Sequence, residues 1–303
     1  MISKFEVLGY RGTKVIRSPI AEERFREISQ AKRTCMDLTA SEETISLLLG
    51  NYLDWEQALL ALAQRYVVFP NYDHSQAMVD RLELDRRVSN LLSACRFYLD
   101  RSEATISAFY GKRSAELKKF KHARSVCYDR AAAYRFLEAL RNYVQHCGFA
   151  IGAIAFKSHG LENGGDAMGE FRIGATVDLR SLRESGDFKS AVLSEYSAEV
   201  RDVDLVPLFR VYVHEILGLH ELLREILTPK RNDAQKLYSD ALREFSHSAF
   251  GELKTPRLLV INDAGAVTSE IHLVDYPIEH YRFLSGRPIC TRRFDRAFVS
   301  NRC

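Results

Sequence analysis

Long apolar runs, paired cysteine motifs and an excess of one charge sign are all missing from this 303-residue sequence. The most apolar stretch, FAIGAIAF at residues 149–156, is much shorter than the roughly 20 residues that cross a bilayer, so we expect no membrane span. The N-terminus contains Lys4 and Glu6 and has no continuous apolar core, which argues against a signal peptide. These absences favour a globular, cytoplasmic protein.

Cysteine is present, but without the spacing that disulfide or metal chemistry needs. No two cysteines form a CxxC pair, and their positions follow no metal-ligand rhythm, so we expect reduced thiols and no metal site. The net charge of +3 is nearly balanced, so a nucleic-acid-binding surface has to be local. The six cysteines are Cys35, Cys95, Cys127, Cys147, Cys290 and Cys303.

The hydrophobic pattern predicts a mainly α-helical protein in three consecutive segments. The first segment, residues 1–72, starts with one or two strands around a glycine-bearing turn. A short helix at 21–31 follows, and then a second helix that Thr39 or Ser41 opens. The last segment, residues 251–303, is predicted to be a β-hairpin with a short tail.

The middle segment, residues 73–250, is predicted to be an antiparallel helical bundle with a small β insertion near 149–180. Gly111 ends its first long amphipathic helix, and Pro229 separates its last two helices. The helices are expected at 75–110, 125–147, 204–227 and 232–246.

The most informative stretch is ALRNYVQHCGF at residues 139–149, which brings Arg141, Asn142 and His146 within two helical turns. Asn142 and His146 are four residues apart and lie one above the other on the polar side, with Arg135 on the same line. A permanently charged guanidinium and an imidazole that titrates near neutrality can break an RNA strand without metal. Gly148 follows, where a left-handed C-cap is expected.

The longer segment YDRAAAYRFLEALRNYVQHCG resembles the signature helix of HEPN domains, in which arginine, a polar residue, a few spacers and histidine form the active motif. Asn142 holds the polar position, and the aromatic-rich lead-in and the following glycine also fit. The resemblance covers roughly residues 75–230. It implies a HEPN-like helical bundle that forms a homodimer, with two copies of the motif on either side of a two-fold cleft.

The same resemblance implies a metal-independent endoribonuclease without a cofactor, of the kind common in toxins and phage defence. Its catalytic residues are then Arg141, Asn142 and His146. Histidine transfers a proton, arginine stabilises the anionic phosphorane, and asparagine orients the phosphate or the imidazole. Attack by the 2′-hydroxyl leaves a 2′,3′-cyclic phosphate and a 5′-hydroxyl. The expected partners are an RNA substrate, a second copy of the chain, and an antitoxin or a sensor.

The densest positive run, KRSAELKKFKHAR at residues 112–124, directly precedes this helix. Lys118, Lys119 and Lys121 are its candidate RNA contacts, and Phe120 is available for stacking on a base. The charges spread around the helix instead of forming one stripe, so a solvated helix or linker is the preferred interpretation. Arg135 is the better candidate for RNA binding, because it aligns with Asn142 and His146.

Two sequence features are weaker candidates for other chemistry. VHEILGLHE contains His214 and His220, but these are six residues apart and point about 120° from one another, which does not suit zinc. The glycine-rich ENGGDAMGE turn lacks the Gly-Lys-Ser/Thr ending of a phosphate-binding loop, and a strand pattern follows it.

Two other interpretations of the whole chain stay open. It can be a catalytically inert HEPN-type regulatory subunit that binds RNA or a protein without cutting, or a plain helical scaffold. Asn142 is then a capping or solvent-facing residue, His146 a partly buried cap residue, and Arg141 a surface salt-bridge partner. Only the enzyme loses an activity when His146 is replaced by alanine.

Overall fold

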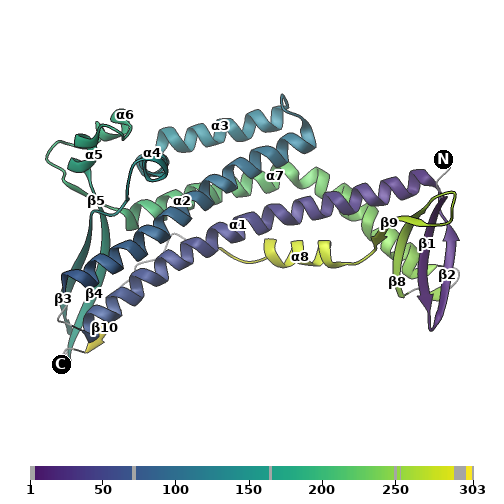
Figure 1. The fold of residues 1–303 in the computed structure, drawn as a ribbon, viewed down its shortest axis with the longest axis horizontal. Helices are drawn as coiled ribbons and strands as arrows, with labels where there is room; N and C mark the ends of the chain where they lie inside the picture. The colour runs from purple at the N-terminus through teal and green to yellow at the C-terminus, as the bar shows by residue number, and fades with distance from the viewer. Residues whose placement is uncertain are drawn as a thin grey trace. The chain divides into compact units, whose positions relative to one another are not determined.

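The computed structural model describes residues 4–69, 73–163, 166–248, 251–252, 254–289 and 298–301. Helices make up most of this part of the chain (Figure 1), which confirms the mainly α prediction. No helix in it is both long enough and apolar enough to pass through a bilayer. The helices are α1 (Glu22–Val68), α2 (His74–Tyr110), α3 (Ala115–Arg130), α4 (Ala132–His146), α5 (Leu179–Ser185), α6 (Ser190–Leu193), α7 (Leu205–Ser246) and α8 (Tyr276–Ser285).

The described strand pairs are all antiparallel. The strands are β1 (Lys4–Arg11), β2 (Lys14–Pro19), β3 (Ala153–Asn163), β4 (Asp166–Asp178), β5 (Asp202–Asp204), β6 (His247–Ser248), β7 (Gly251–Glu252), β8 (Lys254–Ile261), β9 (Val267–His272) and β10 (Phe298–Asn301). One sheet has the order β2-β1-β8-β9, and a second has the order β10-β4-β3 with β5 beside β4. Strands β6 and β7 pair with each other.

The chain folds into two compact units. Unit 1 consists of Met1–Thr44 and Arg224–Pro288, and unit 2 consists of Ile45–Leu223 and Ile289–Cys303. This division differs from the three consecutive segments that the sequence pattern indicates, because each unit combines two stretches that are far apart in the sequence.

Two hairpins that are far apart in the sequence, β1–β2 and β8–β9, form one sheet in unit 1. Strand β1 pairs with β8, which places Val7 opposite Leu258. Both hairpins are predicted from the sequence and confirmed. Gly12, with a φ of 58°, provides the left-handed residue of the first turn. In the second turn, the Asn262 side chain accepts the backbone N–H of Ala266 at 2.9 Å.

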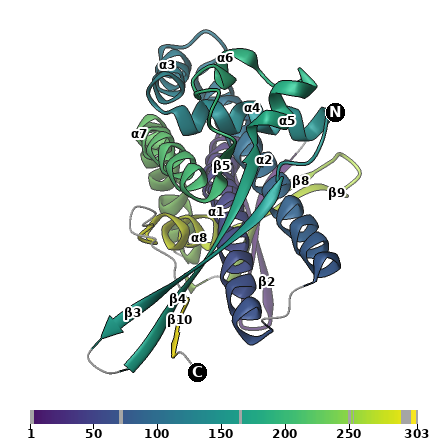
Figure 2. The ribbon, with the colours of Figure 1, turned by 90° about the vertical axis from the view of Figure 1, so that its left-hand side faces the viewer.

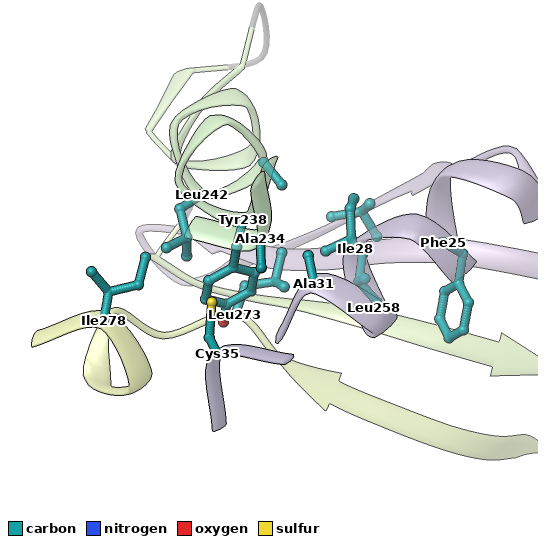
Figure 3. Close-up of a cluster of buried hydrophobic side chains, with 12 residues drawn as sticks. Phe25, Ile28, Ala31, Cys35, Ala234, Tyr238, Leu242, Leu258, Leu273 and Ile278 are labelled. Carbon is teal, nitrogen blue, oxygen red and sulfur yellow. The ribbon is translucent and has the colours of Figure 1, made fainter. Parts of the chain in front are cut away.

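This sheet packs against the parts of α1 and α7 that belong to unit 1 (Figure 3). Tyr238 is fully buried in the middle of the cluster, and its hydroxyl donates to the carbonyl oxygen of Val274 at 3.0 Å. Burial of these apolar side chains is the main stabilising contribution in unit 1. The cluster comprises Val7, Phe25, Ile28, Ala31, Cys35, Ala234, Tyr238, Ala241, Leu242, Leu258, Leu273 and Ile278.

Helix α1 is one continuous helix, so the prediction of two helices before Pro70 is wrong. Thr39 and Ser41, the expected N-caps, lie inside it. The Thr39 hydroxyl donates to the Cys35 carbonyl at 2.9 Å and to the Pro277 carbonyl at 2.8 Å. A hydroxyl that bonds the carbonyl one turn back is compatible with a helix interior.

Helix α7 is also continuous, and the predicted interruption at Pro229 does not occur. The neighbouring Thr228 hydroxyl donates to the Arg224 carbonyl at 2.7 Å. Arg224 also forms a two-pronged bond to Glu42 of α1, with distances of 2.8 and 2.6 Å. Tertiary contacts one turn before the proline therefore support the helix where its own hydrogen-bond ladder loses a donor.

In unit 2 the long helix α2 is confirmed almost to the residue. The Asp73 side chain caps it by accepting the N–H of Gln76 at 2.8 Å, and Gly111 ends it with a φ of 96°. The apolar residues at helical spacing along it are buried. They are Leu84, Val88, Leu91, Leu92, Cys95 and Leu99.

The helix expected at 125–147 is two helices, α3 and α4. Ala131 lies between them with an extended backbone (φ −106°, ψ 108°). Helix α3 starts ten residues earlier than expected and is capped by the Ser114 side chain. Ser125, the first residue of the expected helix, lies within α3, so the predicted start is wrong.

The β insertion is confirmed as the hairpin of β3 and β4, with Ala153 opposite Thr176 (Figure 2). Short helices α5 and α6, which the sequence pattern does not predict, lie between β4 and β5. The Asp178 side chain caps α5 by accepting the N–H groups of Arg180 and Ser181. Phe188, in the segment between α5 and α6, packs on Phe136 of α4 with ring centroids 5.5 Å apart.

Candidate functional site

Helix α4 carries the predicted catalytic residues and is strongly amphipathic. Phe136, Leu137 and Leu140 are fully buried on one side, where α4 packs against α2, α3 and α6. Asn142 and His146 are exposed on the other side, near the C-terminal end. The predicted division of this helix into an apolar and a polar side is therefore confirmed.

The structure brings Arg141 and Asn142 into direct contact. Arg141 Nη1 donates to Asn142 Oδ1 at 3.0 Å. The Arg141 side chain is half-buried, and its Nε is shielded from solvent without an acceptor among the described residues. His146 lies one turn beyond Asn142, and within the described part of the chain its imidazole has no hydrogen-bond partner. These three side chains can present a fixed cation, an amide and an accessible imidazole to one ligand.

Gly148 has a role other than the predicted left-handed cap. Its φ is not positive, and the N–H groups of Cys147 and Gly148 both donate to the Tyr143 carbonyl. A Cβ atom on Gly148 would lie 2.9 Å from the Tyr143 hydroxyl oxygen. Glycine therefore allows the chain to pass close to the Tyr143 ring as it leaves α4.

Arg135 is occupied by contacts within unit 2. Its Nε and Nη2 donate to the two carboxylate oxygens of Glu195 at 2.7 Å each, which raises the pKa of the guanidinium. Its Nη1 donates to the carbonyl oxygens of Tyr128 and Asp129 at 2.7 and 2.6 Å. Arg135 does align with Asn142 and His146 on α4, but its donors hold the end of α3 instead of facing a substrate. These contacts give Arg135 a structural role, and its selection as an RNA contact stays a prediction.

The basic run forms most of α3, which agrees with the preferred interpretation of a solvated helix. Lys118 and Lys119 are exposed, and Lys121 is exposed but lies 3.4 Å from Glu103. Phe120 is fully buried, so it is not available to stack on a base and that suggestion is wrong. Lys118, Lys119 and Lys121 stay candidate RNA contacts, and Glu103 partly neutralises the last of them.

Sequence reasoning missed a polar network beside α4. Glu138, one turn before Asn142, accepts a 2.5 Å hydrogen bond from the buried Tyr212 hydroxyl. Arg124 lies 2.9 Å from Glu103 and 3.9 Å from Glu138. Burial raises the pKa of Tyr212 well above its usual value, with nearby acidic groups adding to the effect, so its hydroxyl stays protonated.

Glu103, Arg124 and Glu138 line a cavity of about 440 Å³ that also includes Tyr134. Glu138 stands out in the sequence as an acid four residues before Asn142, but its partners come from α2, α3 and α7. No local pattern links those positions, so spacing alone could not assemble the network.

The zinc interpretation receives no support. His220 is buried and its Nδ1 lies 3.0 Å from the hydroxyl oxygen of Tyr98. The described residues contain no group of three His, Cys, Asp or Glu side chains placed to hold a metal ion. Four of the cysteines are described, and Cys35, Cys95, Cys127 and Cys147 are all free thiols.

Comparison with known proteins gives no match to a family model, to a curated protein or to a solved structure. The chemistry of the α4 surface therefore has to be argued from its own residues.

Proposed function

We propose that the protein is a metal-independent endoribonuclease of HEPN type, acting as a toxin or phage-defence effector. The observation that carries the proposal is the accessible end of α4. There Arg141 is hydrogen-bonded to Asn142, and His146 lies exposed one turn further on. The mainly helical unit 2, with α2, α3 and α4 packed together, is compatible with the HEPN-like bundle that the resemblance implies.

In the proposed reaction, the 2′-hydroxyl of RNA attacks the adjacent phosphorus and displaces the 5′ oxygen. His146 takes the 2′ proton or gives a proton to the leaving oxygen, a role that typically contributes about 10²- to 10⁴-fold. Arg141 stabilises the negative charge that develops on the phosphorane oxygens. Its bond to Asn142 restricts the side-chain motion of both residues, so substrate binding loses less side-chain entropy.

A homodimer fits this chemistry better than a single chain does. One motif supplies one histidine, whereas separate acid and base roles favour two. A symmetric interface repeats each residue across its two-fold axis, so two copies of α4 supply a second His146 from the same sequence. The exposed position of the motif leaves it accessible to such a partner.

The test is cleavage of total RNA by the purified protein in EDTA, with analysis of the fragment ends. We expect fragments with 2′,3′-cyclic phosphate ends from the parent protein. His146→Ala should cut about 10²- to 10⁴-fold more slowly. Arg141→Ala should lose activity on a similar scale. Gln145→Ala is the matched control, because this neighbouring side chain is exposed and lies outside the motif.

The proposal is wrong if the parent protein leaves RNA intact in EDTA, or if His146→Ala and Gln145→Ala cut equally well. Circular dichroism shows whether each variant is folded, so that loss of structure is not mistaken for loss of chemistry. Light scattering measures the mass in solution. A fully active monomer would contradict the dimeric part of the proposal.

The catalytically inert regulatory subunit is the second candidate, and one observation favours it. A general base is usually oriented by another group, yet His146 has no hydrogen-bond partner among the described residues. In that case the parent protein retards RNA in a gel, and the bound RNA is recovered uncut. The Arg141→Ala variant then loses binding, because the guanidinium contacts the phosphate.

A further inference from the structure

A cavity of about 750 Å³ lies in unit 2 between α1, the β3–β4 hairpin and the first turns of α7. This volume is in the range of small-molecule sites, roughly 300–1,000 Å³. Leu59, Leu60 and Ala63 of α1 form an apolar wall. Val206 and Pro207 extend it from the start of α7.

The hairpin side of the cavity combines small and basic residues on one face. Ala155 on β3 is opposite Gly174 on β4, and Lys157 is opposite Arg172 two residues along. Residues two apart on a strand share a face, so the small pair leaves space and the basic pair borders it. A Cβ atom on Gly174 would lie only 3.2 Å from an Asp204 oxygen, so larger residues would narrow the cavity.

Arg210 of α7 is the unusual residue of this cavity. It is half-buried, and its Nε is shielded from solvent without a hydrogen-bond partner. Among the described residues it has no ion pair. The acids that line the cavity are Asp202 and Asp204, and neither forms an ion pair with Arg210 in the described structure. Asp204 Oδ1 accepts the backbone N–H of Val206 at 2.9 Å. A partly buried guanidinium without an acceptor is costly, and an anionic ligand relieves that cost.

We infer that this cavity binds a mononucleotide, with its phosphate on Arg210 and Lys157. Such a ligand needs basic side chains for its phosphate and an acceptor for its hydroxyl or amino groups, and the cavity contains both. The cations suit the phosphate, and the exposed carboxylate of Asp202 accepts hydrogen bonds from ribose hydroxyls or an exocyclic amine. The apolar wall of α1 covers the face of the base. The inference stands independently of ribonuclease activity, because it uses none of the residues of the α4 motif.

Isothermal titration calorimetry tests the inference with the full chain. The probes are AMP, GMP, CMP and UMP, each compared with its nucleoside and with inorganic phosphate. At least one mononucleotide should bind tenfold or more tightly than both of its parts. Arg210→Gln should weaken that binding about 10- to 100-fold, as expected for a lost hydrogen bond to a charged group. Arg243→Gln is the control, because this exposed arginine pairs with Asp240 and does not line the cavity.

Three results overturn the inference. They are no binding of any of the four nucleotides, equal binding of inorganic phosphate, and unchanged binding in Arg210→Gln. Thermal unfolding shows whether Arg210→Gln is folded. If it is not, Lys157→Gln decides, because that exposed side chain has no ion pair in the described structure. Nucleotide affinity equal to the parent in a folded Lys157→Gln also refutes the site.

Discussion

Replacing Arg135 by alanine should destabilise unit 2 far more than replacing its acidic partner Glu195. The guanidinium makes four hydrogen bonds, two to Glu195 and two to the carbonyl oxygens of Tyr128 and Asp129. The carbonyls lie in the last turn of α3, where the helix itself provides no donor. Arg135→Ala removes both sets of bonds, whereas Glu195→Ala removes only the ion pair and leaves the carbonyls satisfied.

The expected size follows from these contacts. The Arg135 and Glu195 side chains are 21% and 29% exposed, so solvent screening limits the pair to about 0–1 kcal/mol. Hydrogen bonds from a charged donor contribute about 1.5–3 kcal/mol when buried. The contribution is smaller here, because water reaches the partly exposed Arg135 side chain and can replace some of the lost hydrogen bonds. We expect a loss of about 2–3 kcal/mol for Arg135→Ala. For a unit of this size, that lowers Tm by roughly 4–12 °C.

Urea unfolding of the two single variants and the double variant measures the loss of stability caused by each substitution. The double variant should resemble Arg135→Ala, because little of the pair is left once the arginine is gone. Glu195 has a pKa lowered by Arg135, so its stabilising effect is present above the ordinary carboxyl pKa of 4.5 and is lost as pH falls.

Arg180→Ala, which breaks an exposed pair with Glu184, is the control and should leave the free energy of unfolding unchanged. Equal losses for Arg135→Ala and Glu195→Ala would refute the reasoning. So would unchanged stability with weakened RNA binding, which would favour Arg135 as a substrate contact.

Two further predictions concern α3 and the buried thiols. Ser114→Ala should lower the free energy of unfolding in urea by about 1 kcal/mol, because it removes the N-cap of α3. Ser125→Ala, at an exposed position within the helix, is the control and should lower it much less. Equal losses of stability in the two variants would mean that α3 starts elsewhere. Burial raises the pKa of the Cys35 and Cys127 thiols to about 11, with Glu215 adding to the effect at Cys127. The neutral thiols therefore stabilise the fold fully below pH 9, and that contribution is lost as pH rises towards 11. Iodoacetamide at pH 8 should label the exposed Cys147 before the buried Cys35 and Cys127, as mapped by mass spectrometry. Rapid labelling of Cys127 in the folded protein would contradict its burial.

The elements that the sequence predicts well are those with a local signal at each end. Helix α2 has an aspartate cap and a glycine stop, and the terminal hairpins have turns built on Gly12 and Asn262. The amphipathic character of α4 is likewise local, so the exposed Asn142 and His146 could be placed from helical periodicity alone. These signals act over a few residues and need no knowledge of distant partners.

The errors arise where a distant contact decides between two locally acceptable structures. Thr39 fits an N-cap as well as a helix interior, and its bond to Pro277 belongs to the second. Pro229 favours a break, yet α7 continues next to the bonds between Arg224 and Glu42. The break between α3 and α4 contains no glycine or proline, so the local sequence does not predict it. It is held by the contact of Arg135 with Glu195, sixty residues further along the chain.

The pairing of β1 with β8 has a consequence for synthesis on the ribosome. Lys4 lies opposite Ile261 in this ladder, so β1 cannot pair with β8 until Ile261 has been translated. At a translation rate of about 5–20 residues per second, the edge of the nascent N-terminal hairpin stays unpaired for roughly 10–50 s. During that interval the hairpin is open to mispairing, and a chaperone that covers it would raise the yield of native protein.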